Sequence, residues 1–276
     1  MNPILKWAGG KRKLLSEIKR YISLENIGDH AFYEPFLGGG AVCFGLECRN
    51  AVVNDLNQEL MNVYKQVRDR PKELIRELKK HAKNHSHDHY YQTRNLERTE
   101  SYRKLPDIKK AARFIYLNKT CYNGLYRVNL KGYFNVPLGR YKNPDIVMAE
   151  RITELSSYLN NNNIQLLSCD FEKCIEEAKA GDVVYFDPPY DYEDGGFTAY
   201  SFKGFSREDL IRLEKTCSVL VDRGCVVLVS NNDTEFVNKL FSSGKYIIEH
   251  IEAPRFISCN GKNRCKAKDV LIYGRC

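Results

Sequence analysis

The sequence predicts an α/β protein with a doubly wound, mostly parallel sheet into which a helical segment is inserted. Seven short runs rich in β-branched and aromatic residues lie in the two flanks of the chain, mostly separated by helical stretches. Several of these runs are almost continuously apolar, which is typical of strands covered on both faces. Residues 56–119 instead show helical periodicity. We therefore expect one α/β domain formed by 1–56 and 146–276, and an inserted helical domain at 57–145.

The individual elements follow from local patterns. The expected strands are AFYEP (31–35), NAVVND (50–55), IQLLS (164–168), DVVYFD (182–187), GCVVLVS (224–230), YIIEHI (246–251) and DVLIYG (269–274). A helix is expected at 11–22. Ser206 with Asp209 resembles a capping box before a helix at 207–222, and Asp233 with Thr234 marks the start of another at 234–242. Residues 121–141 are rich in Gly, Asn and Tyr, which predicts a hairpin or an extended loop.

Composition places the chain among soluble globular proteins. Of its 276 residues 43% are apolar and 28% charged, and no apolar run approaches the roughly 20 residues of a membrane span. The N-terminus lacks the apolar stretch of a signal peptide, so a cytoplasmic monomer is expected, with no membrane partner. The ten cysteines are scattered without a C-x-x-C pair, and we interpret them as reduced, mostly buried thiols.

Positive charge is concentrated in one part of the chain. Residues 57–145 contain 20 Lys and Arg against 9 Asp and Glu, whereas the whole chain has 43 and 35, a net charge of +8. This segregation suggests that the insert faces a polyanion, and a solvated basic helical face is the alternative. Four histidines in HAKNHSHDHYY (81–91) are interpreted as a solvated helix end rather than a metal site, because no thiolate is near.

A glycine-rich loop follows the first expected strand. Gly38, Gly39 and Gly40 allow a ligand to approach the backbone at the carboxyl edge of the sheet, and Asp55 ends the next strand, where an acid typically binds ribose hydroxyls. Together they indicate a nucleoside-containing cofactor, with a dehydrogenase as one rival and a structural turn beside an unrelated acid as the plain alternative. Trp7, the only tryptophan, and Lys11 suit a cofactor pocket and a carboxylate, although Trp7 is equally suited to holding the chain terminus in place.

The fourth expected strand ends in Asp187-Pro188-Pro189-Tyr190, the DPPY motif. The simple interpretation is a strand stopped by prolines. The alternative is a rigid pair of acceptors, the Asp187 carboxylate and the Pro188 carbonyl, for the two hydrogens of an exocyclic base amine. Such acceptors draw the nitrogen toward tetrahedral geometry and free its lone pair for an electrophilic carbon. Because the prolines fix the carbonyl beforehand, little ordering cost remains, and Tyr190 offers a stacking face.

With these motifs in view, the chain resembles the DNA adenine methyltransferase (Dam) family of S-adenosylmethionine-dependent enzymes, of the D12 class, over nearly its whole length. The matching stretches are KWAGGK (6–11), EPFLGGGAV (34–42), NDLN (54–57), NGLYRVN (123–129), FNVPLGRY (134–141), FDPPY (186–190), FTAY (197–200), SNNDT (230–234) and NGKNRCKAK (260–268). The resemblance implies a Rossmann-like methyltransferase sheet and a basic target-recognition insert. It implies cofactor-binding roles for Trp7, Lys11, Phe36, Gly38, Gly40, Asp55, Asp170, Phe171 and Asp187, and catalytic roles for Asp187, Pro188 and Tyr190.

The implied reaction is methyl transfer from S-adenosylmethionine to the 6-amino group of a flipped adenine in double-stranded DNA, within GATC, without a metal. The implied DNA-binding residues are Lys6, Asn123, Leu125, Arg127, Pro137, Arg140 and Tyr141. Arg127 is the best candidate for a base contact, and a phosphate contact is the plain alternative for the others. One departure from the family is the acidic stretch DYEDGG (191–196), expected to repel nearby phosphates.

Other functions stay open on the sequence alone. A cytosine amino-methylating enzyme would use the same acceptor pair, although Ser or Asn at position 187 would favour it more. A protein or RNA methylase would not need the basic insert, and a DNA-binding regulator would not need an intact DPPY motif. Whether the enzyme acts alone or belongs to a restriction-modification pair is not determined by the sequence.

Overall fold

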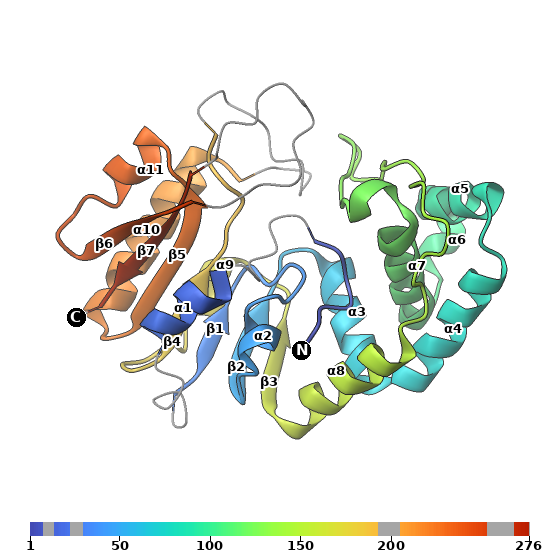
Figure 1. Ribbon diagram of the computed structural model, residues 1–276, viewed down its shortest axis with the longest axis horizontal. Coiled ribbons are helices and arrows are strands. Elements are labelled where there is room, and N and C mark those ends of the chain that lie inside the picture. Colours follow the sequence, from blue (N-terminus) through green and yellow to red (C-terminus); the bar gives the residue numbers. More distant parts are fainter. Residues whose placement is uncertain (8–13, 23–29, 193–204, 253–267, 276) are drawn as a thin grey trace.

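A seven-stranded sheet forms the centre of the computed structural model, which describes residues 1–7, 14–22, 30–192, 205–252 and 268–275 (Figure 1). The strand order is β3-β2-β1-β4-β5-β7-β6. The first five of these strands are parallel, and β7 runs antiparallel to both of its neighbours. The strands are β1 (Phe32–Glu34), β2 (Asn50–Asn54), β3 (Asn163–Leu167), β4 (Val183–Phe186), β5 (Val226–Asn232), β6 (Tyr246–Glu252) and β7 (Lys268–Gly274). All seven predicted strands are thereby confirmed.

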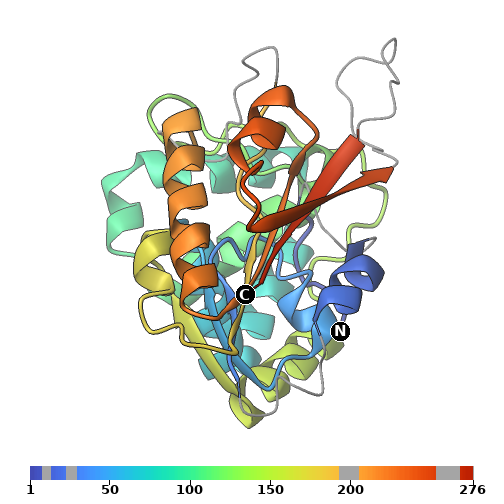
Figure 2. The same cartoon turned by 90° about the vertical axis from the view of Figure 1, so that its left-hand side faces the viewer.

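Helices cover both faces of the sheet, as predicted for a doubly wound fold. The flanking helices are α1 (Leu15–Tyr21), α2 (Cys43–Leu46), α8 (Ala149–Asn161), α9 (Phe171–Cys174), α10 (Arg207–Asp222) and α11 (Glu235–Leu240). In β4 the side chains of Val184 and Phe186 pack on the face covered by α9, α10 and α11, whereas Val183 and Tyr185 pack on the opposite face. Figure 2 shows α10 lying along its face of the sheet. Every residue of β4 is therefore buried, which explains its uninterrupted apolar sequence.

Local capping defines where several helices begin. Ser206 accepts a hydrogen bond from the Asp209 amide while the Asp209 carboxylate accepts one from the Ser206 amide, so the predicted capping box is present before α10. The Thr234 hydroxyl caps α11 in the same way, through the Val237 amide. The described part of the expected helix at 11–22 is α1, and Lys11 lies outside the described residues.

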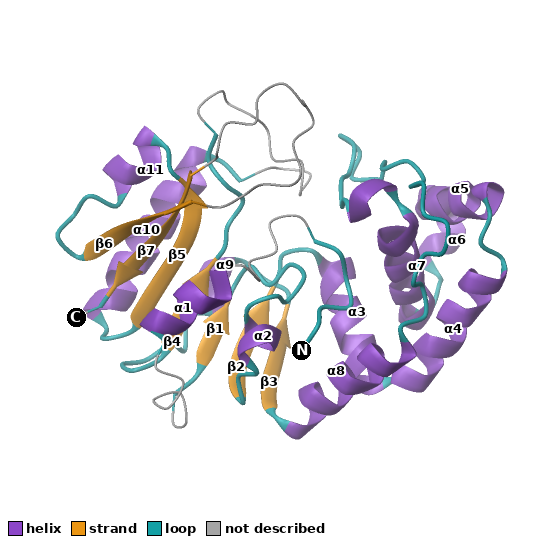
Figure 3. Ribbon diagram, in the orientation of Figure 1, coloured by secondary structure: helices purple, strands orange, loops and turns teal. Residues whose placement is uncertain are grey.

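The middle of the chain is helical and lies beside the sheet at the β3 end (Figures 1 and 3). Its elements are α3 (Gln58–Asp69), α4 (Pro71–Lys83), α5 (His87–Asn95), the 3-10 turn η3 (Leu96–Arg98), α6 (Glu100–Arg103) and α7 (Asp107–Thr120). No strand occurs in residues 58–120, all of which are described, as the periodicity predicted. Leu60 and Val63 of α3 belong to the same hydrophobic cluster as Phe32 of the sheet, so the insert and the sheet share one core.

The segment at 121–141, which we call the recognition hairpin after the role that the family resemblance implies, folds back on itself without a continuous ladder. It begins with the 3-10 turn η4 (Tyr122–Gly124), and two isolated antiparallel bridges join Cys121 to Leu138 and Val128 to Phe134. The segment has the fold-back and antiparallel bridges of a hairpin but the irregular backbone of an extended loop, so it combines features of the two predicted alternatives. The Asn129 side chain organises the tip by accepting hydrogen bonds from the amides of Lys131 and Tyr133 at 3.0 Å each.

The cysteines of the described residues are free thiols, as expected; they are Cys43, Cys48, Cys121, Cys169, Cys174, Cys217 and Cys225. Among the described residues no helix combines the length and the apolar character needed to cross a bilayer.

Candidate active site

The carboxyl ends of five parallel strands meet at one edge of the sheet. The sheet order reverses direction between β1 and β4, and ligands of open α/β sheets bind at such a point, just beyond the strand ends. The glycine loop follows β1 and the DPPY motif follows β4, so the topology brings these two motifs to either side of the reversal. Asp55 follows β2 and Asp170 follows β3 at the same edge.

The glycine loop has a backbone that other residues would not adopt easily. Gly38 and Gly40 have φ values of +50° and +69°, in the left-handed region that favours glycine. A Cβ at Gly38 would lie 2.6 Å from Nε1 of Trp7, and one at Gly40 would lie 2.1 Å from the Phe44 ring. The loop is therefore shaped by close contact with Trp7 on one side and Phe44 on the other.

Asp55 is a structural partner of this loop. Its Oδ2 accepts a hydrogen bond from the Gly38 amide at 3.0 Å, and its Oδ1 accepts one from the Asn57 amide at 2.9 Å. Burial raises the pKa of Asp55, and these two hydrogen bonds oppose that effect. Each carboxylate oxygen has a second lone pair, so the geometry leaves acceptor capacity for a ligand hydroxyl.

Asn54 joins the loops after β1 and β3, a role that is not evident from the sequence. Its side-chain amide donates to the carbonyls of Pro35 and Cys169 at 3.0 Å each, and its Oδ1 accepts the Cys169 amide at 2.9 Å. The side chain is 1% exposed. These bonds hold the strand-end loops on both sides of β2 at a set separation.

Four phenylalanines line the edge beside the glycine loop. Phe36 lies 5.6 Å from Phe171 and from Phe205, and 6.4 Å from Phe186, measured between ring centroids. Phe171 begins α9, which Asp170 caps by accepting the Glu172 amide. The Asp170 carboxylate also pairs with Arg212 at 2.9 Å, so its orientation is fixed by hydrogen bonds and an ion pair within the protein. Several of the rings lie at steep angles to one another, and Phe171 and Phe186 are buried. The half-buried Phe36 and Phe205 therefore offer the apolar surface of the kind that binds a base.

The DPPY motif lies at the sheet edge and is partly buried there. Pro188 is buried, whereas Asp187, Pro189 and Tyr190 are half-buried and therefore accessible to a ligand. The next residue, Asp191, donates its amide to Asn231 Oδ1 at 3.0 Å, and its carbonyl accepts the Asn232 side chain at 2.5 Å. The end of β5 thus fixes the chain directly after the motif.

The expected acidic surface at 191–196 is wrong for its first member. The Asp191 carboxylate is buried, pairs with Arg207 and accepts the Thr234 hydroxyl at 2.8 Å, so it cannot repel phosphate from the surface. Burial of a charged group is tolerated when the charge is paired and hydrogen-bonded, as here. The other acids of the stretch, Glu193 and Asp194, lie outside the described residues, as does the FTAY motif.

A second buried carboxyl was not identified from the sequence. Glu34 ends β1, is 2% exposed, and accepts the Cys43 amide at 2.9 Å. Burial, more than the nearby Cys43, Asp187 and Asp55, raises its pKa well above the ordinary value. The hydrogen bond fixes α2 behind the glycine loop, so we assign Glu34 a supporting role there.

The recognition hairpin presents most of its candidate residues to solvent. Four of them are exposed: Asn123, Arg127, Pro137 and Arg140. The other two, Leu125 and Tyr141, are half-buried. The Leu125 carbonyl accepts a hydrogen bond from the Cys121 thiol, and the Lys6 ammonium lies over the Tyr141 ring. The Arg127 guanidinium is held by Asn135, with Nε 2.7 Å from Oδ1 and Nη2 3.4 Å from the Asn135 carbonyl. The arginine is thus oriented before any ligand arrives, and Asn135 is a further residue that sequence reasoning missed.

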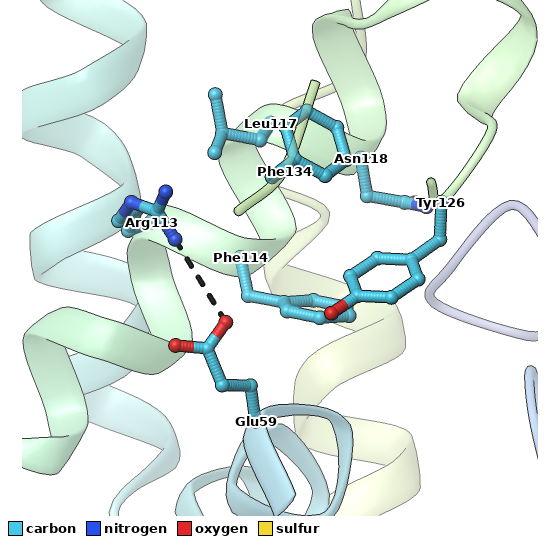
Figure 4. A pocket seen from close by; sticks show the side chains of 7 residues that line it. All are labelled: Glu59, Arg113, Phe114, Leu117, Asn118, Tyr126 and Phe134. Atoms are coloured by element: carbon cyan, nitrogen blue, oxygen red, sulfur yellow. Dashed lines mark ion pairs between the residues drawn. The ribbon is translucent and has the colours of Figure 1, made fainter. Parts of the chain in front are cut away.

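A buried arginine lies near Tyr126 and Phe134 of the hairpin, across a small cavity (Figure 4). Arg113 of α7 is 2% exposed and pairs with Glu97 at 3.0 Å and with Glu59 at 3.8 Å. Glu97 in turn accepts the Phe134 amide of the hairpin at 2.6 Å. A small cavity lies beside the Arg113–Glu59 ion pair, and it is lined by Glu59, Arg113, Phe114, Leu117, Asn118, Tyr126 and Phe134. Its lining is mostly packing surface, so we assign it to support of the hairpin.

The interpretation of the histidines as a solvated helix end is wrong for three of the four. His81 stacks on Tyr116 with a centroid distance of 4.7 Å, its Nδ1 lies 3.0 Å from Nε2 of His89, and His85 Nδ1 bonds the Tyr116 hydroxyl at 2.9 Å. Burial is the main reason that the pKa of His81 is lowered to about 4. His87 alone is exposed. Within the described residues, no three His, Cys, Asp or Glu side chains converge as metal ligands.

The chain is similar to known proteins over almost its whole length. The sequence model of the family described as D12 class N6 adenine-specific DNA methyltransferase matches residues 7–255. A "Type II methyltransferase M1.LlaDCHI" of Lactococcus lactis subsp. cremoris is 42% identical over 99% of this chain and 96% of its own. "Type II methyltransferase M.MjaIII" of Methanocaldococcus jannaschii is 39% identical over 96% and 95%, and a "DNA adenine methylase" of Escherichia coli K12 is 35% identical over 97% and 93%.

Proposed function

Because the chain belongs to the D12 class of N6 adenine-specific DNA methyltransferases, we propose that it transfers a methyl group from S-adenosylmethionine to the 6-amino group of a flipped adenine in GATC. Membership of this family excludes the dehydrogenase and cytosine-specific alternatives. Family membership also identifies the protein as an enzyme that acts on DNA. The donor, the flipped base, the target sequence and the residue roles belong to the proposal.

The single observation that carries the proposal is the position of the DPPY motif. It follows β4, across the reversal of strand order from the glycine loop, so both motifs lie at the same edge of the sheet, where ligands of open α/β sheets bind. An acceptor pair for an amine and a loop suited to a nucleoside therefore end neighbouring strands. This arrangement suits a reaction between two bound molecules rather than the binding of one.

The residues present fit S-adenosylmethionine. Asp55 has the chemistry and position for ribose hydroxyls, Phe36, packed beside Phe171, offers apolar surface for the adenine, and Trp7 lies against Gly38. Gly40 shapes the loop and Asp170 orients α9; Lys11 is proposed for the carboxylate, outside the described residues. When bound, the cofactor supplies a methyl group on a positively charged sulfur.

The DPPY motif would act on the target base. The Asp187 carboxylate and the Pro188 carbonyl accept the two amine hydrogens and direct the nitrogen lone pair outward. Tyr190 stacks on the base, which offsets part of the few kcal/mol that extrusion from the duplex costs. Asn231 accepts the Asp191 amide and Asn232 donates to the Asp191 carbonyl, which holds the residue after the motif, so little reorganisation is needed at the moment of reaction.

The insert at 57–145 is proposed as the target-recognition domain, with 1–56 and 146–276 as the catalytic domain. Support comes from the excess positive charge of the insert and from the exposure of Arg127, Arg140 and Asn123 on the recognition hairpin. Lys6, Leu125, Pro137 and Tyr141 are proposed to contact the same duplex. We further propose that the protein acts as a monomer in the cytoplasm.

A restriction digest tests the proposal directly. Plasmid is isolated from a methylation-deficient strain that expresses the chain. It is then digested with a nuclease that cleaves GATC sites only when they are unmethylated. Protection at GATC is the expected result, and the strain without the gene is the control. Complete cutting, with methylation of another adenine site detected by sequencing, would contradict the GATC assignment while leaving the family membership intact.

A further inference from the structure

The N-terminal residues Lys6 and Trp7 lie between the glycine loop and the recognition hairpin. On one side, a Cβ built on Gly38 would lie 2.6 Å from Trp7 Nε1, and one built on Gly39 would lie 2.8 Å from Trp7 Cβ. The tryptophan therefore rests directly on the backbone of the glycine loop. Real Cβ atoms are not found so close to other atoms, so this contact exists because positions 38 and 39 are glycine.

On its other side, Trp7 stacks on a residue of the recognition hairpin. The rings of Trp7 and Tyr126 are 5.5 Å apart at 21°, and Tyr126 stacks in turn on Phe114 of α7 at 5.3 Å and 27°. Trp7 also lies 6.5 Å from Phe114. The three rings are nearly parallel and each lies within 6.5 Å of the other two, so they form one compact cluster, and aromatic pairs in such geometry gain stability beyond that of burial alone.

The backbone on either side of the stack is joined by Asn118. Its Oδ1 accepts the Lys6 amide at 2.9 Å, while its Nδ2 donates to the Lys6 carbonyl at 2.7 Å and to the Gly124 carbonyl at 3.3 Å. Lys6 also packs on Gly124, because a Cβ built on Gly124 would lie 2.4 Å from the Cβ of Lys6. The Lys6 Nζ lies 3.7 Å from the centroid of the Tyr141 ring. Asn118 is 3% exposed, so these bonds are shielded from water. The N-terminal segment and the start of the hairpin are therefore held as one unit.

From these contacts we propose that Tyr126 is a positioning residue for cofactor binding, and that the Trp7–Tyr126 stack couples binding of duplex DNA to binding of S-adenosylmethionine. The inference rests on the proposed function, which places DNA on the hairpin and the cofactor at the glycine loop. A ligand that restricts the hairpin restricts Tyr126, which in turn restricts Trp7 and the loop beneath it. Coupling of this kind is reciprocal, so each ligand changes the affinity for the other by the same factor.

The test uses Tyr126→Leu, which removes the ring, and Tyr126→Phe, which keeps it. The dissociation constant of S-adenosylmethionine is measured by calorimetry with the free protein and with the protein bound to a GATC duplex in which the adenines of both strands are already methylated, so that no turnover occurs. Tyr126→Leu should weaken cofactor binding by about 2- to 10-fold and reduce the effect of the duplex toward none, and Tyr126→Phe should restore both. Tyr133→Leu, a change of the same kind in the same hairpin, should bind the cofactor like wild type.

Trp7 supplies a second readout, because it is the only tryptophan of the chain. Its emission reports the environment of the stack without any need for activity. Adding the duplex alone should change the emission of the wild type and of Tyr126→Phe, but not that of Tyr126→Leu. If Tyr126→Leu does not fold, Phe114→Leu removes the ring that lies beside both Trp7 and Tyr126 and should show the same reduced coupling.

Two failures are distinguishable. A Tyr126→Leu protein with wild-type cofactor affinity and an undiminished effect of the duplex overturns the inference and leaves the proposed function standing. A wild-type protein that binds no S-adenosylmethionine overturns the proposed function, and the inference with it.

Discussion

Asp191 and Arg207 form a two-pronged ion pair, with Nε 2.9 Å from Oδ1 and Nη2 3.1 Å from Oδ2. The Asp191 side chain is 6% exposed and that of Arg207 is 49% exposed, so the carboxylate depends on a partner that solvent can reach. Asp191 directly follows the DPPY motif, and Arg207 begins α10. The pair therefore holds the end of the motif against the helix that covers its face of the sheet.

Removing the arginine should destabilise the protein. In Arg207→Met the Asp191 carboxylate stays buried without its cation, and the expected loss is about 1–3 kcal/mol in the free energy of unfolding. Urea denaturation followed by circular dichroism measures it. The matched control is Arg151→Met, which breaks the solvent-exposed pair with Asp145 and should cost less than about 0.5 kcal/mol. Equal losses in the two variants would contradict the structural role of the pair.

Asp187→Ala should abolish turnover and leave duplex binding nearly unchanged. The substitution removes one acceptor for the amine of the target base but none of the proposed contacts between the insert and the duplex, so the methylation rate should fall by at least about 100-fold. Single-turnover assays with labelled S-adenosylmethionine give the rate, and fluorescence anisotropy gives the affinity for DNA. Asp145→Ala, at a solvent-exposed site in the insert, serves as the control. Substantial methylation by Asp187→Ala would refute the role of the carboxylate.

Sequence choice should depend on Asn135 as well as on Arg127. A bidentate arginine contact to guanine discriminates by about 1–3 kcal/mol, and that contact requires an oriented guanidinium. Arg127→Ala should therefore relax sequence choice, and Asn135→Ala should relax it by a smaller factor, about 3- to 10-fold, because the arginine is present but loses its orienting partner. The measurement compares methylation rates on GATC and on singly substituted duplexes.

Lys109→Ala is the control for this prediction. The side chain is exposed on α7, in the basic insert, and is expected to contact phosphate only. Its removal should weaken binding to all duplexes alike and reduce the salt dependence of binding by about one unit of slope. If Asn135→Ala behaves like Lys109→Ala, then Asn135 contacts DNA rather than orienting Arg127.

Glu34→Gln should stabilise the protein increasingly as pH rises. The pKa of Glu34 is raised well above the ordinary 4.5, mainly by burial. The folded protein then holds a proton that the unfolded chain has released, so the contribution of Glu34 to stability falls as pH rises above that value. Glutamine keeps an acceptor for the Cys43 amide without the charge. Its advantage should be small near pH 4.5 and grow by on the order of 1 kcal/mol per pH unit above it, up to the folded-state pKa.

Urea midpoints at several pH values check this prediction. Glu154→Gln, an exposed position of α8, makes the same chemical change at the surface and serves as the control. Parallel stability curves for wild type and Glu34→Gln across the range would show that the burial of Glu34 has no thermodynamic consequence.

The sequence by itself determined every strand, the start of α10 and α11, and the placement of the glycine loop, Asp55 and the DPPY motif at one edge of the sheet. These features are local, because apolar periodicity and capping residues act within a few positions of one another, and a parallel topology then places all strand ends together. Only the tertiary structure decided that Asp191 is buried against Arg207, that His81 packs on Tyr116, and that Asn135 orients Arg127. It also decided that Trp7 stacks on Tyr126, more than a hundred residues away. Each of these depends on which side chains meet after folding, and a polar or aromatic residue in a loop has the same local pattern whether or not a partner reaches it.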